Sequence, residues 1–414
     1  MLPTYRVPRG AGKGGLPEAT GFGYDGGMPK LRIVHTVSSL HGGGMEHFVL
    51  RLVETQRGQG HDASILALRS GPLEGMARDR GLPTTVLQGN KIERIARAGI
   101  AFGVTRPHII HAHNPTSLHY ATVGKLLGRA RLVYTDHAQT RGIIRVPSQY
   151  EWRQCDAVIG CSKDTADRCG AVGIVHPIHV IHNGIEIKPA TKTREQVRAE
   201  LGLGGEYVGI MPAAFHRVKG HDILLRAIAA LRDEELDLTA TADPRAQEAR
   251  VRVLVAGDGD ERDRIHGLAK ELKLGPEWVT FLGFRKDVPE LLAGVDFFVL
   301  PSRMEGLPLS ILEAMARRLP VVVTPVGGVP EVVTDGEHGL IVPVEDPRAL
   351  GEAIGRLAED PELGKRFGEA GARRVEEEFS FVRMARKYED LYLRVLEAQP
   401  TGIAGRRSAA GGAA

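Results

Sequence analysis

The chain has 414 residues, which is long for one hydrophobic core and comfortable for two domains. Hydrophobic residues make up 42% of it and charged residues 25%, a composition typical of a soluble α/β protein. The net charge of +3 argues against nucleic-acid binding by the chain as a whole. Basic residues outnumber acidic ones between Pro29 and Glu186, which permits either a weak preference for an anionic acceptor or membrane, or an ordinary solvated surface.

The two ends of the chain carry no periodic pattern. Residues 1–28 are rich in Gly, Pro and Arg, so we expect a disordered leader, or an upstream start ahead of a natural start at Met28. We also expect a disordered tail over residues 399–414. No apolar run is long enough for a membrane span and no signal-peptide core is present, so we expect a cytoplasmic protein, with weak peripheral association with the inner face of the plasma membrane left open.

Three cysteines, Cys155, Cys161 and Cys169, match no zinc or redox spacing. Their odd number argues against a disulfide framework.

Along the first half of the chain, short apolar segments rich in β-branched residues alternate with segments whose apolar residues have helical spacing. Such runs are typical of buried parallel strands joined by helices. The predicted strands are Leu31–Val37, Asp62–Leu68, His108–His113, Arg131–Thr135, Ala157–Cys161 and His179–His182, and the predicted helices include Glu46–Arg57, Ile92–Val104 and Lys163–Cys169.

The second half repeats this alternation, which predicts two doubly wound sheets. Its strands are expected at Tyr207–Met211, Arg252–Ala256, Val279–Leu282, Phe297–Leu300, Pro320–Val323 and Gly339–Val342. Its helices are expected at Ile223–Leu231, Glu261–Leu272, Leu307–Arg317, Ala349–Leu357 and Phe381–Leu396.

Proline and lysine break the pattern between Gly184 and Arg194, so the boundary between the domains is placed there. We predict a first domain over residues 29–188, a second over 189–378 and a last helical segment over 379–398. In open α/β sheets a ligand lies beyond the carboxyl ends of the strands, so polar residues at those ends are the candidates for function.

A glycine-rich turn follows the first predicted strand. Its Gly43 and Gly44 let the backbone approach a ligand, and the helix that follows favours a phosphate or an acceptor oxygen at its start, beside Glu46. The spacing is neither that of a dinucleotide fingerprint nor that of a P-loop, and a plain tight turn explains it equally well.

Histidines end two other predicted strands. His111 and His113 lie on one face of a strand and could form a metal pair, but no third ligand has a clear spacing, so we expect no metal. His113, with Asn114 after it, and His137 are better candidates for cleft residues, although a lone histidine is more often satisfied by its neighbours.

The strongest pattern lies between Pro301 and Glu313. A buried strand ends in a Gly/Pro turn and enters a helix, so the amides of Gly306–Ser310 suit a phosphate oxygen. Glu305 and Glu313 can accept paired hydrogen bonds from the vicinal hydroxyls of a sugar. Lys219, before another helix, can neutralise a diphosphate, or it is a surface lysine.

Over roughly Leu31 to Leu396 the sequence resembles glycosyltransferase family 4, whose members have the GT-B fold. The motifs appear in family order, and together they are specific. They comprise the Gly43-Gly44-x-Glu46 turn, His113, Asp156–Ser162, Ile181–Gly184, Lys219-Gly220, Val255–Gly259, Phe281–Phe284, the Glu305-x7-Glu313 pair and Val326–Glu331.

The resemblance implies an α/β fold of two Rossmann-like domains facing across a cleft, the first binding the acceptor and the second the nucleotide sugar. The last helix would cross back onto the first domain. It also implies a retaining glycosyltransferase that moves a sugar from a UDP- or GDP-sugar to a hydroxyl of a cell-envelope polysaccharide, a lipid-linked intermediate or a small molecule. No metal and no cofactor are implied, because a lysine, amides and a helix terminus take the place of a divalent ion.

Site residues follow from the same resemblance. The catalytic residues would be His113, Lys219 and Glu305. The donor would contact Gly43, Gly44, Gly283, Arg285, Gly306, Leu307, Pro308, Leu309, Ser310 and Glu313. Candidates on the acceptor side are Glu46, Asn114 and His137, and the loops Pro115–Tyr120 and Gln139–Gln149 would set acceptor specificity.

One position departs from the family pattern. Family members commonly have an arginine five residues before the motif lysine, and this chain has Ala214. Either Arg217 or Arg303 replaces that arginine, or donor binding is weaker.

Two alternatives remain open from the sequence. One is a nucleotide-sugar epimerase of the same architecture, which an assay without acceptor would reveal by the epimer it releases. The other is a non-catalytic protein that binds a sugar nucleotide.

Overall fold

The computed structural model describes residues 29–41, 43–127, 130–137, 147–171, 177–187, 189–240 and 251–398. Met1–Lys30 and Leu31–Ala414 form separate units, and both sheets lie in the second. The expected leader, the alternative start at Met28 and the expected tail lie outside the described residues, as do residues 139–146 of one proposed acceptor loop.

The first sheet has seven parallel strands within the described residues, in the order β3-β2-β1-β4-β5-β6-β7. The strands are β1 (Arg32–Val37), β2 (Asp62–Ala67), β3 (Thr84–Val86), β4 (Ile109–Ala112), β5 (Arg131–Asp136), β6 (Ala157–Gly160) and β7 (Ile178–Val180). The helices that follow them are α1 (Gly44–Gly58), α2 (Leu73–Asp79), α3 (Lys91–Thr105), α4 (Pro115–Leu127), α5 (Gln149–Gln154) and α6 (Lys163–Ala171).

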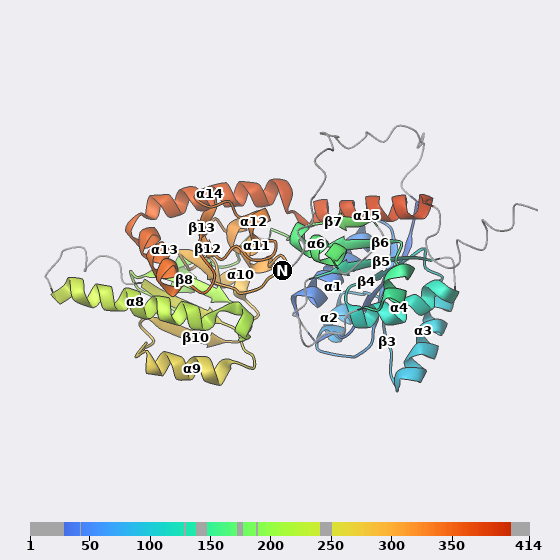
Figure 1. Ribbon diagram of the computed structural model, residues 1–414, viewed down its shortest axis with the longest axis horizontal. Coiled ribbons are helices and arrows are strands. Elements are labelled where there is room, and N and C mark those ends of the chain that lie inside the picture. The colour runs from blue at the N-terminus through green and yellow to red at the C-terminus, as the bar shows by residue number, and fades with distance from the viewer. Residues whose placement is uncertain are drawn as a thin grey trace, which may run out of the picture. The chain divides into compact units, whose positions relative to one another are not determined.

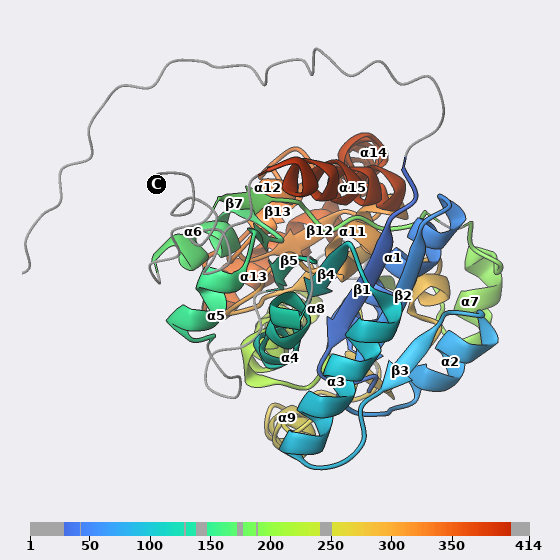
Figure 2. The same ribbon diagram turned by 90° about the vertical axis from the view of Figure 1, so that its right-hand side faces the viewer.

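Both faces of this sheet are buried, because successive side chains of a strand point to opposite sides. Ile33 of β1 and Ile109 of β4 pack into one cluster with α1 and α2. Their neighbours Val34 and Ile110 pack into a second cluster with α3 and α4. Figure 2 shows α3 and α4 together beside the strands. Burial on both sides explains the continuous apolar runs of the sequence.

The second sheet has six parallel strands among the described residues, in the order β10-β9-β8-β11-β12-β13. The strands are β8 (Tyr207–Pro212), β9 (Val251–Ala256), β10 (Val279–Gly283), β11 (Phe297–Leu300), β12 (Val321–Val323) and β13 (Gly339–Ile341). Its helices are α7 (Arg194–Glu200), α8 (His221–Ala240), α9 (Arg262–Glu271), α10 (Val288–Leu291), α11 (Leu309–Ala316), α12 (Val329–Val332), α13 (Pro347–Glu359) and α14 (Pro361–Glu378), of which Figure 1 shows α8 and α13 side by side.

The last helix, α15 (Phe381–Glu397), returns to the first sheet, as the fold prediction required. Its Tyr388 and Tyr392 are fully buried in the cluster formed by β1, β4 and α1. Two buried polar contacts hold it there: Glu389 with His61 at 2.8 Å, and the Tyr392 hydroxyl with Nδ1 of His111 at 2.7 Å. The red helix α15 can be followed in Figure 1.

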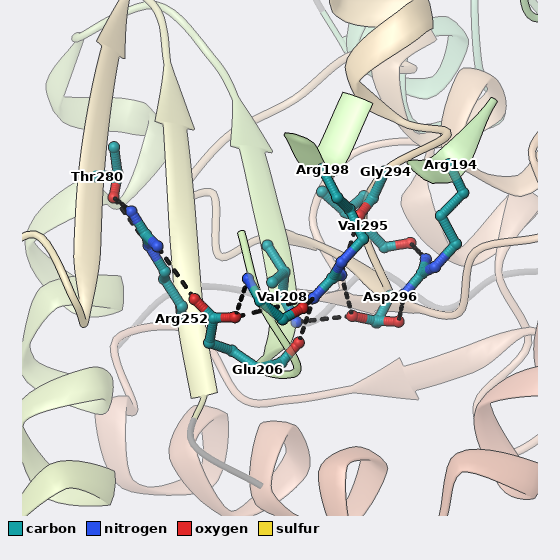
Figure 3. Close-up of polar contacts among 10 residues, drawn as sticks. Arg194, Arg198, Glu206, Val208, Arg252, Thr280, Gly294, Val295 and Asp296 are labelled. Carbon is teal, nitrogen blue, oxygen red and sulfur yellow. Dashed lines mark hydrogen bonds and ion pairs between the residues drawn. The ribbon is translucent and has the colours of Figure 1, made fainter. Parts of the chain in front are cut away.

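The amino ends of the second sheet are fastened by ion pairs, which Figure 3 shows. Arg252 bridges the Glu206 carboxylate and the Thr280 hydroxyl, with bonds of about 3 Å. Arg194 and Arg198 of α7 both bind Asp296, whose carboxylate also accepts the amide of Val208. The charges at this end of the strands are therefore paired with one another.

Every strand predicted from the sequence is present to within two residues, and the prediction of two doubly wound sheets is confirmed. The prediction of a loop at Pro115–Tyr120 is wrong, because these residues form the first turns of α4. Asn114 caps that helix by accepting the Ser117 amide at 2.8 Å, and proline is well tolerated at a first helical position. None of the helices in the described ranges is both long and apolar enough to cross a bilayer.

Candidate functional site

Strand order reverses direction in each sheet between two central strands: β1 and β4 in the first, β8 and β11 in the second. The loops that leave the carboxyl ends of such strands diverge and create a crevice for a ligand. Most of the expected site residues lie in the loops after these strands or at the starts of the helices that follow.

Lys219 and Glu305 form the central ion pair of the second sheet's crevice. Lys219 ends a short 3-10 turn (Arg217–Lys219), and its Nζ lies 2.7 Å and 2.9 Å from the two carboxylate oxygens of Glu305. The Ser302 hydroxyl donates to the same carboxylate at 2.7 Å. Gly220 has a φ of +75°, and a Cβ there would meet the carbonyl oxygen of Pro301, so only glycine lets the two loops approach this closely.

Helix α11 begins beside this pair without a side-chain cap. Its N-cap is Pro308, which has no side chain able to accept a hydrogen bond, so the first amides of the helix keep their donor capacity. The loop before it is held by the Gly328 amide, which donates to the Gly306 carbonyl at 2.6 Å, and by Asn183, which donates to the Leu307 carbonyl at 3.1 Å. Uncapped amides at a helix start favour an anion.

A cavity of about 210 Å³ opens at this pair. Its wall joins the two sheets, because His137, which follows β5, lies opposite residues that follow β8 and β11. The residues that line it are His137, Val218, Lys219, Met304, Glu305, Gly306 and Leu307. The structure thus brings together His137, Lys219 and Glu305. In sequence, His137 lies 82 residues before Lys219, and Lys219 lies 86 residues before Glu305.

Glu313 lies in the second turn of α11. Burial raises the pKa of its carboxyl, and the charges of Arg51 and Arg317 partly offset this rise. Among the described residues no hydrogen bond to its carboxylate is present. The side chain is half-buried, so a ligand that donates hydrogen bonds to this carboxylate would offset its partial loss of water.

The glycine turn of the first sheet is covered by its own glutamate. Gly43 is the N-cap of α1, and a Cβ on Gly43 would lie 2.6 Å from Oε2 of Glu46. Burial raises the pKa of Glu46, and the amides of Glu46 and Gly43, the charge of His41 and the Ser39 hydroxyl oppose the rise. An anion at Gly43 and Gly44 would therefore have to displace this carboxylate.

Gly283 and Arg285 lie at the outer strand of the second sheet. Gly283 ends β10 with a φ of +66°, and its carbonyl accepts the Gly257 amide at 2.8 Å. Arg285 makes two bonds to Asp287, at 2.7 Å and 2.6 Å, and these bonds keep the pKa of Asp287 low. Its guanidinium is oriented by this pair, and the cavity around Lys219 does not include it.

Arg303, one of the two arginines considered as a replacement for the one missing at Ala214, is paired with two carboxylates. Its guanidinium binds Asp222 at 2.8 Å and 3.0 Å and Glu345 at 2.5 Å and 2.9 Å. Arg217 is exposed, and no ion pair of its side chain is present within the described ranges, so it is the arginine that stays available.

His113 lies behind the cavity rather than in its wall. It is fully buried and shares hydrogen bonds with His35 at 2.9 Å and His137 at 3.2 Å. The sequence led us to expect a catalytic role for His113, but His137 is the histidine that lines the cavity.

The structure adds a third histidine, His35 of β1, to the pair His111 and His113 that the sequence had indicated. The ligand atoms of these three rings lie within 4.8 Å of one another. All six ring nitrogens have hydrogen-bond partners; those of His111 are Tyr392 and Thr135, both at 2.7 Å. Burial lowers the pKa of every ring, that of His35 to about 4, so the rings are neutral at pH 7. These partners occupy the lone pairs and protons that a metal would need to replace.

Sequence reasoning gave no role to Asn183, Ser302 or Glu331. Glu331 joins the two sheets by accepting the Lys163 amide and His182 Nε2, each at 2.8 Å. Asn183 and Glu331 lie in two of the motifs that match the family pattern, and their presence in those motifs was a sign in the sequence that they have a role. Ser302 carries no such signal, because its role depends on where Glu305 lies.

Family models match most of the described chain. The model described as "Glycosyltransferase Family 4" matches residues 42–188, and that of "Glycosyl transferases group 1" matches residues 193–374.

Three similar curated proteins come from bacteria. The lipopolysaccharide core biosynthesis mannosyltransferase LpcC of Rhizobium leguminosarum bv. viciae is 30% identical over 64% of this chain and 72% of its own length. The lipopolysaccharide core biosynthesis glycosyltransferase LpsE of Rhizobium meliloti is 28% identical over 92% of this chain and 98% of its own. N-acetyl-alpha-D-glucosaminyl L-malate synthase of Bacillus anthracis is 31% identical, but the chain spans only 56% of its length.

Two solved structures share the fold. HepE of Anabaena, crystallised with UDP and glucose, has a TM-score of 0.74 at 22% identity and covers 87% of this chain and 99% of its own. Sucrose-phosphate synthase from Thermosynechococcus elongatus has a TM-score of 0.71 at 22% identity and covers 88% and 99%.

Proposed function

The chain belongs to glycosyltransferase family 4, and on this basis we propose that it transfers a sugar from a nucleotide-sugar donor to an acceptor hydroxyl, with retention of the anomeric configuration. The observation that carries the proposal is the Lys219–Glu305 pair at the uncapped start of α11, inside a cavity that also contains His137.

The donor diphosphate would take over Lys219 from Glu305. A diphosphate carries more charge than a carboxylate, and the first amides of α11 add the positive end of a helix dipole. Glu305, released from the ammonium, would accept hydrogen bonds from the hydroxyls of the transferred sugar. The pair thus supports both halves of donor binding with residues that are already in place.

The developing charge on the leaving diphosphate is the step that these groups would stabilise. A fixed ammonium and oriented amides cost no reorganisation when the charge appears. We therefore propose that the reaction needs neither a divalent ion nor a cofactor, and that His113, behind His137, acts through that ring on the reacting centre.

The nucleoside would extend from α11 toward β10. Glu313 would accept hydrogen bonds from the ribose hydroxyls, which would supply the donors that its half-buried carboxylate lacks. Gly283 and Arg285 would lie beside the base. UDP is one candidate nucleotide, since HepE was crystallised with UDP and with UDP-glucose, and GDP is the other.

The acceptor we propose is a cell-envelope glycan, lipid-linked intermediate or small molecule. The names of LpsE and LpcC, which place those proteins in lipopolysaccharide core synthesis, support the first two choices. Glu46 and His137 are the proposed acceptor-side residues, whereas Asn114 is used as the cap of α4.

A cytoplasmic location is a further proposal, and so is contact with an anionic membrane, which one exposed surface supports. Ile92, Ile100 and Val104 form a stripe along α3 at helical spacing and are 67 to 80% exposed. Leu126 and Leu127, at the end of α4, are 59% and 67% exposed, and Leu127 adjoins the stripe at Gly99.

Exposed basic residues accompany this apolar stripe. Lys91, Arg97 and Arg106 lie on or next to α3, against one acidic residue, Glu93. An apolar stripe accompanied by cations suits the interface of a bilayer with anionic headgroups.

Calorimetric titration of the full chain with UDP, GDP, ADP and TDP, in the presence of EDTA, tests the proposal. Binding of one nucleotide, followed by its release from the matching nucleotide sugar, is expected. An incubation without acceptor that yields an epimer of the donor, rather than free nucleotide and sugar, would make the protein an epimerase. Absence of affinity for all four nucleotides would refute the proposal.

A further inference from the structure

A chain of hydrogen bonds runs from the interior of the first sheet to the cavity. Gln56 Oε1 lies 2.8 Å from Nε2 of His35, whose Nδ1 lies 2.9 Å from Nε2 of His113. Nδ1 of His113 lies 3.2 Å from Nε2 of His137, which lines the cavity. The four side chains come from α1, β1 and the residues that follow β4 and β5.

The inner members of this chain of hydrogen bonds are shielded from solvent. Gln56, His35 and His113 each have no exposed surface. Burial lowers the pKa of His35 and of His137 to about 4 and that of His113 well below its usual range. Each ring therefore carries one proton at neutral pH, so one of its nitrogens donates and the other accepts.

An amide oxygen can only accept, and this one constraint propagates along the chain. His35 must donate from Nε2 to Gln56, which makes its Nδ1 an acceptor. His113 must then donate from Nε2 and accept at Nδ1. His137 must in turn donate from Nε2, and its Nδ1 is left as an acceptor.

The oxygen of the Gln56 amide is the atom that faces His35, and the Nε2 atom of the same amide is buried without a hydrogen-bond partner among the described residues. The hydrogen bond to Gln56 opposes the lowering of the His35 pKa by burial, as an acceptor of the ring proton does.

We propose that Gln56, His35 and His113 are positioning residues that fix His137 as the Nε2–H tautomer, so that its Nδ1 accepts a hydrogen bond from a substrate hydroxyl in the cavity beside Lys219 and Glu305. The identity of that hydroxyl, on the transferred sugar or on the acceptor, rests on the proposed function. The fixed tautomer does not rest on it.

Nitrogen NMR of the ligand-free full chain, labelled with ¹⁵N-histidine, tests the tautomer directly. Wild type should show His35, His113 and His137 all protonated at Nε2. Gln56→Leu removes the acceptor that sets the direction, so the Nδ1 signal of His137 should move toward that of a mixture of tautomers. Gln56→Glu keeps an acceptor-only group at the same place and should retain the wild-type tautomer.

Gln154→Leu is the matched control, since Gln154 is another buried glutamine, in α5, whose Nε2 has no partner within the described residues and which is not part of the histidine chain. It should leave the His137 signals unchanged. An Nδ1-protonated His137 in wild type would overturn the proposal even if Gln56→Leu does not fold. So would a His137 tautomer unaffected by Gln56→Leu, or stoichiometric Zn²⁺ binding that shifts the three buried rings.

A second measurement tests the substrate contact. Release of UDP from UDP-glucose by Gln56→Leu should show a kcat lower by about tenfold with an unchanged KM, because Gln56 does not touch the cavity, and Gln56→Glu should restore kcat. If Gln56→Leu changes the His137 tautomer but has the same kcat as wild type, the proposed contact between His137 Nδ1 and the substrate hydroxyl is refuted. Lack of turnover by wild type with any nucleotide sugar would refute the proposed function, and the NMR result would still decide the tautomer.

Discussion

The ammonium of Lys219 lies between the two carboxylate oxygens of Glu305, at 2.7 Å and 2.9 Å, although 86 residues separate them in sequence. Glu305 is 7% exposed, and the lysine side chain 26%. The pair holds the lysine at the start of α11 before any donor arrives. Exchange of this carboxylate for a diphosphate is the event on which the proposed catalysis depends.

Replacement of Lys219 by alanine should raise the activation free energy by on the order of 2–4 kcal/mol, and so lower kcat, because the ammonium would no longer stabilise the leaving diphosphate. Steady-state nucleotide release measures this. Lys270→Ala, on the exposed side of α9, is the control and should behave as wild type. A Lys219→Ala enzyme with full turnover would exclude the role.

Glu313→Ala should weaken nucleotide binding by about 1.5–3 kcal/mol and change kcat much less, since the ribose contacts are the same in ground and transition states. Titration calorimetry with UDP and GDP reports the affinity. The thermal midpoint of the free protein should not fall, because the variant loses a half-buried carboxyl whose pKa is raised by burial. Unchanged nucleotide affinity together with reduced kcat would contradict the assignment, and Glu352→Ala, an exposed change on α13, serves as the comparison.

Ala214→Arg restores the arginine common in the family at an exposed position of the loop after β8. We expect UDP to bind more tightly by about 1 kcal/mol, or roughly fivefold, with a gain that shrinks as salt rises. Ala214→Gln, of similar length and without charge, should show no gain. Equal affinities for the two variants would mean that this position does not face the diphosphate.

The buried histidines make the fold sensitive to acid. Their pKa values are lower in the folded protein than the usual 6.5, about 4 for His35 and His137, so the unfolded chain binds more protons between these values. The free energy of unfolding should be constant above pH 6.5 and fall toward pH 4, by on the order of 3 kcal/mol for His35 alone. Urea denaturation at a series of pH values measures it.

His35→Asn should lose part of that acid dependence, whereas His41→Asn, at an exposed position, should retain all of it. A wild-type stability that does not change between pH 6.5 and pH 4 would show that these rings are not held neutral.

Ile100→Asp should reduce binding to vesicles that contain phosphatidylglycerol by about tenfold, because it places a charge in the apolar stripe of α3. Vesicle co-sedimentation at low and high salt measures binding, and vesicles of neutral lipid should bind weakly. Val382→Asp changes an exposed valine of α15 and should have no effect. Wild type that binds neither kind of vesicle would remove the membrane from the proposal.

The positions of the strands and the order of the family motifs could be predicted from the sequence. The run Phe297–Leu300 reads as a strand because all four residues are buried, and a buried strand needs an apolar side chain at each position. The α4 segment was missed because its first turn carries proline, threonine and serine, which occur in loops as often as at helix starts. Its cap, Asn114, is recognisable only once the Ser117 amide is seen to bind it.

The sequence by itself determined the two doubly wound sheets and their family, since apolar periodicity and ordered motifs are local properties of the chain. Only the tertiary structure decided which charged and polar groups meet. It pairs Arg303 with Asp222 and Glu345, leaves Arg217 exposed, and places His137 rather than His113 at the cavity. The reason is physical: the partner of a polar side chain is set by a distance of about 3 Å between loops remote in sequence, and no local pattern records that distance.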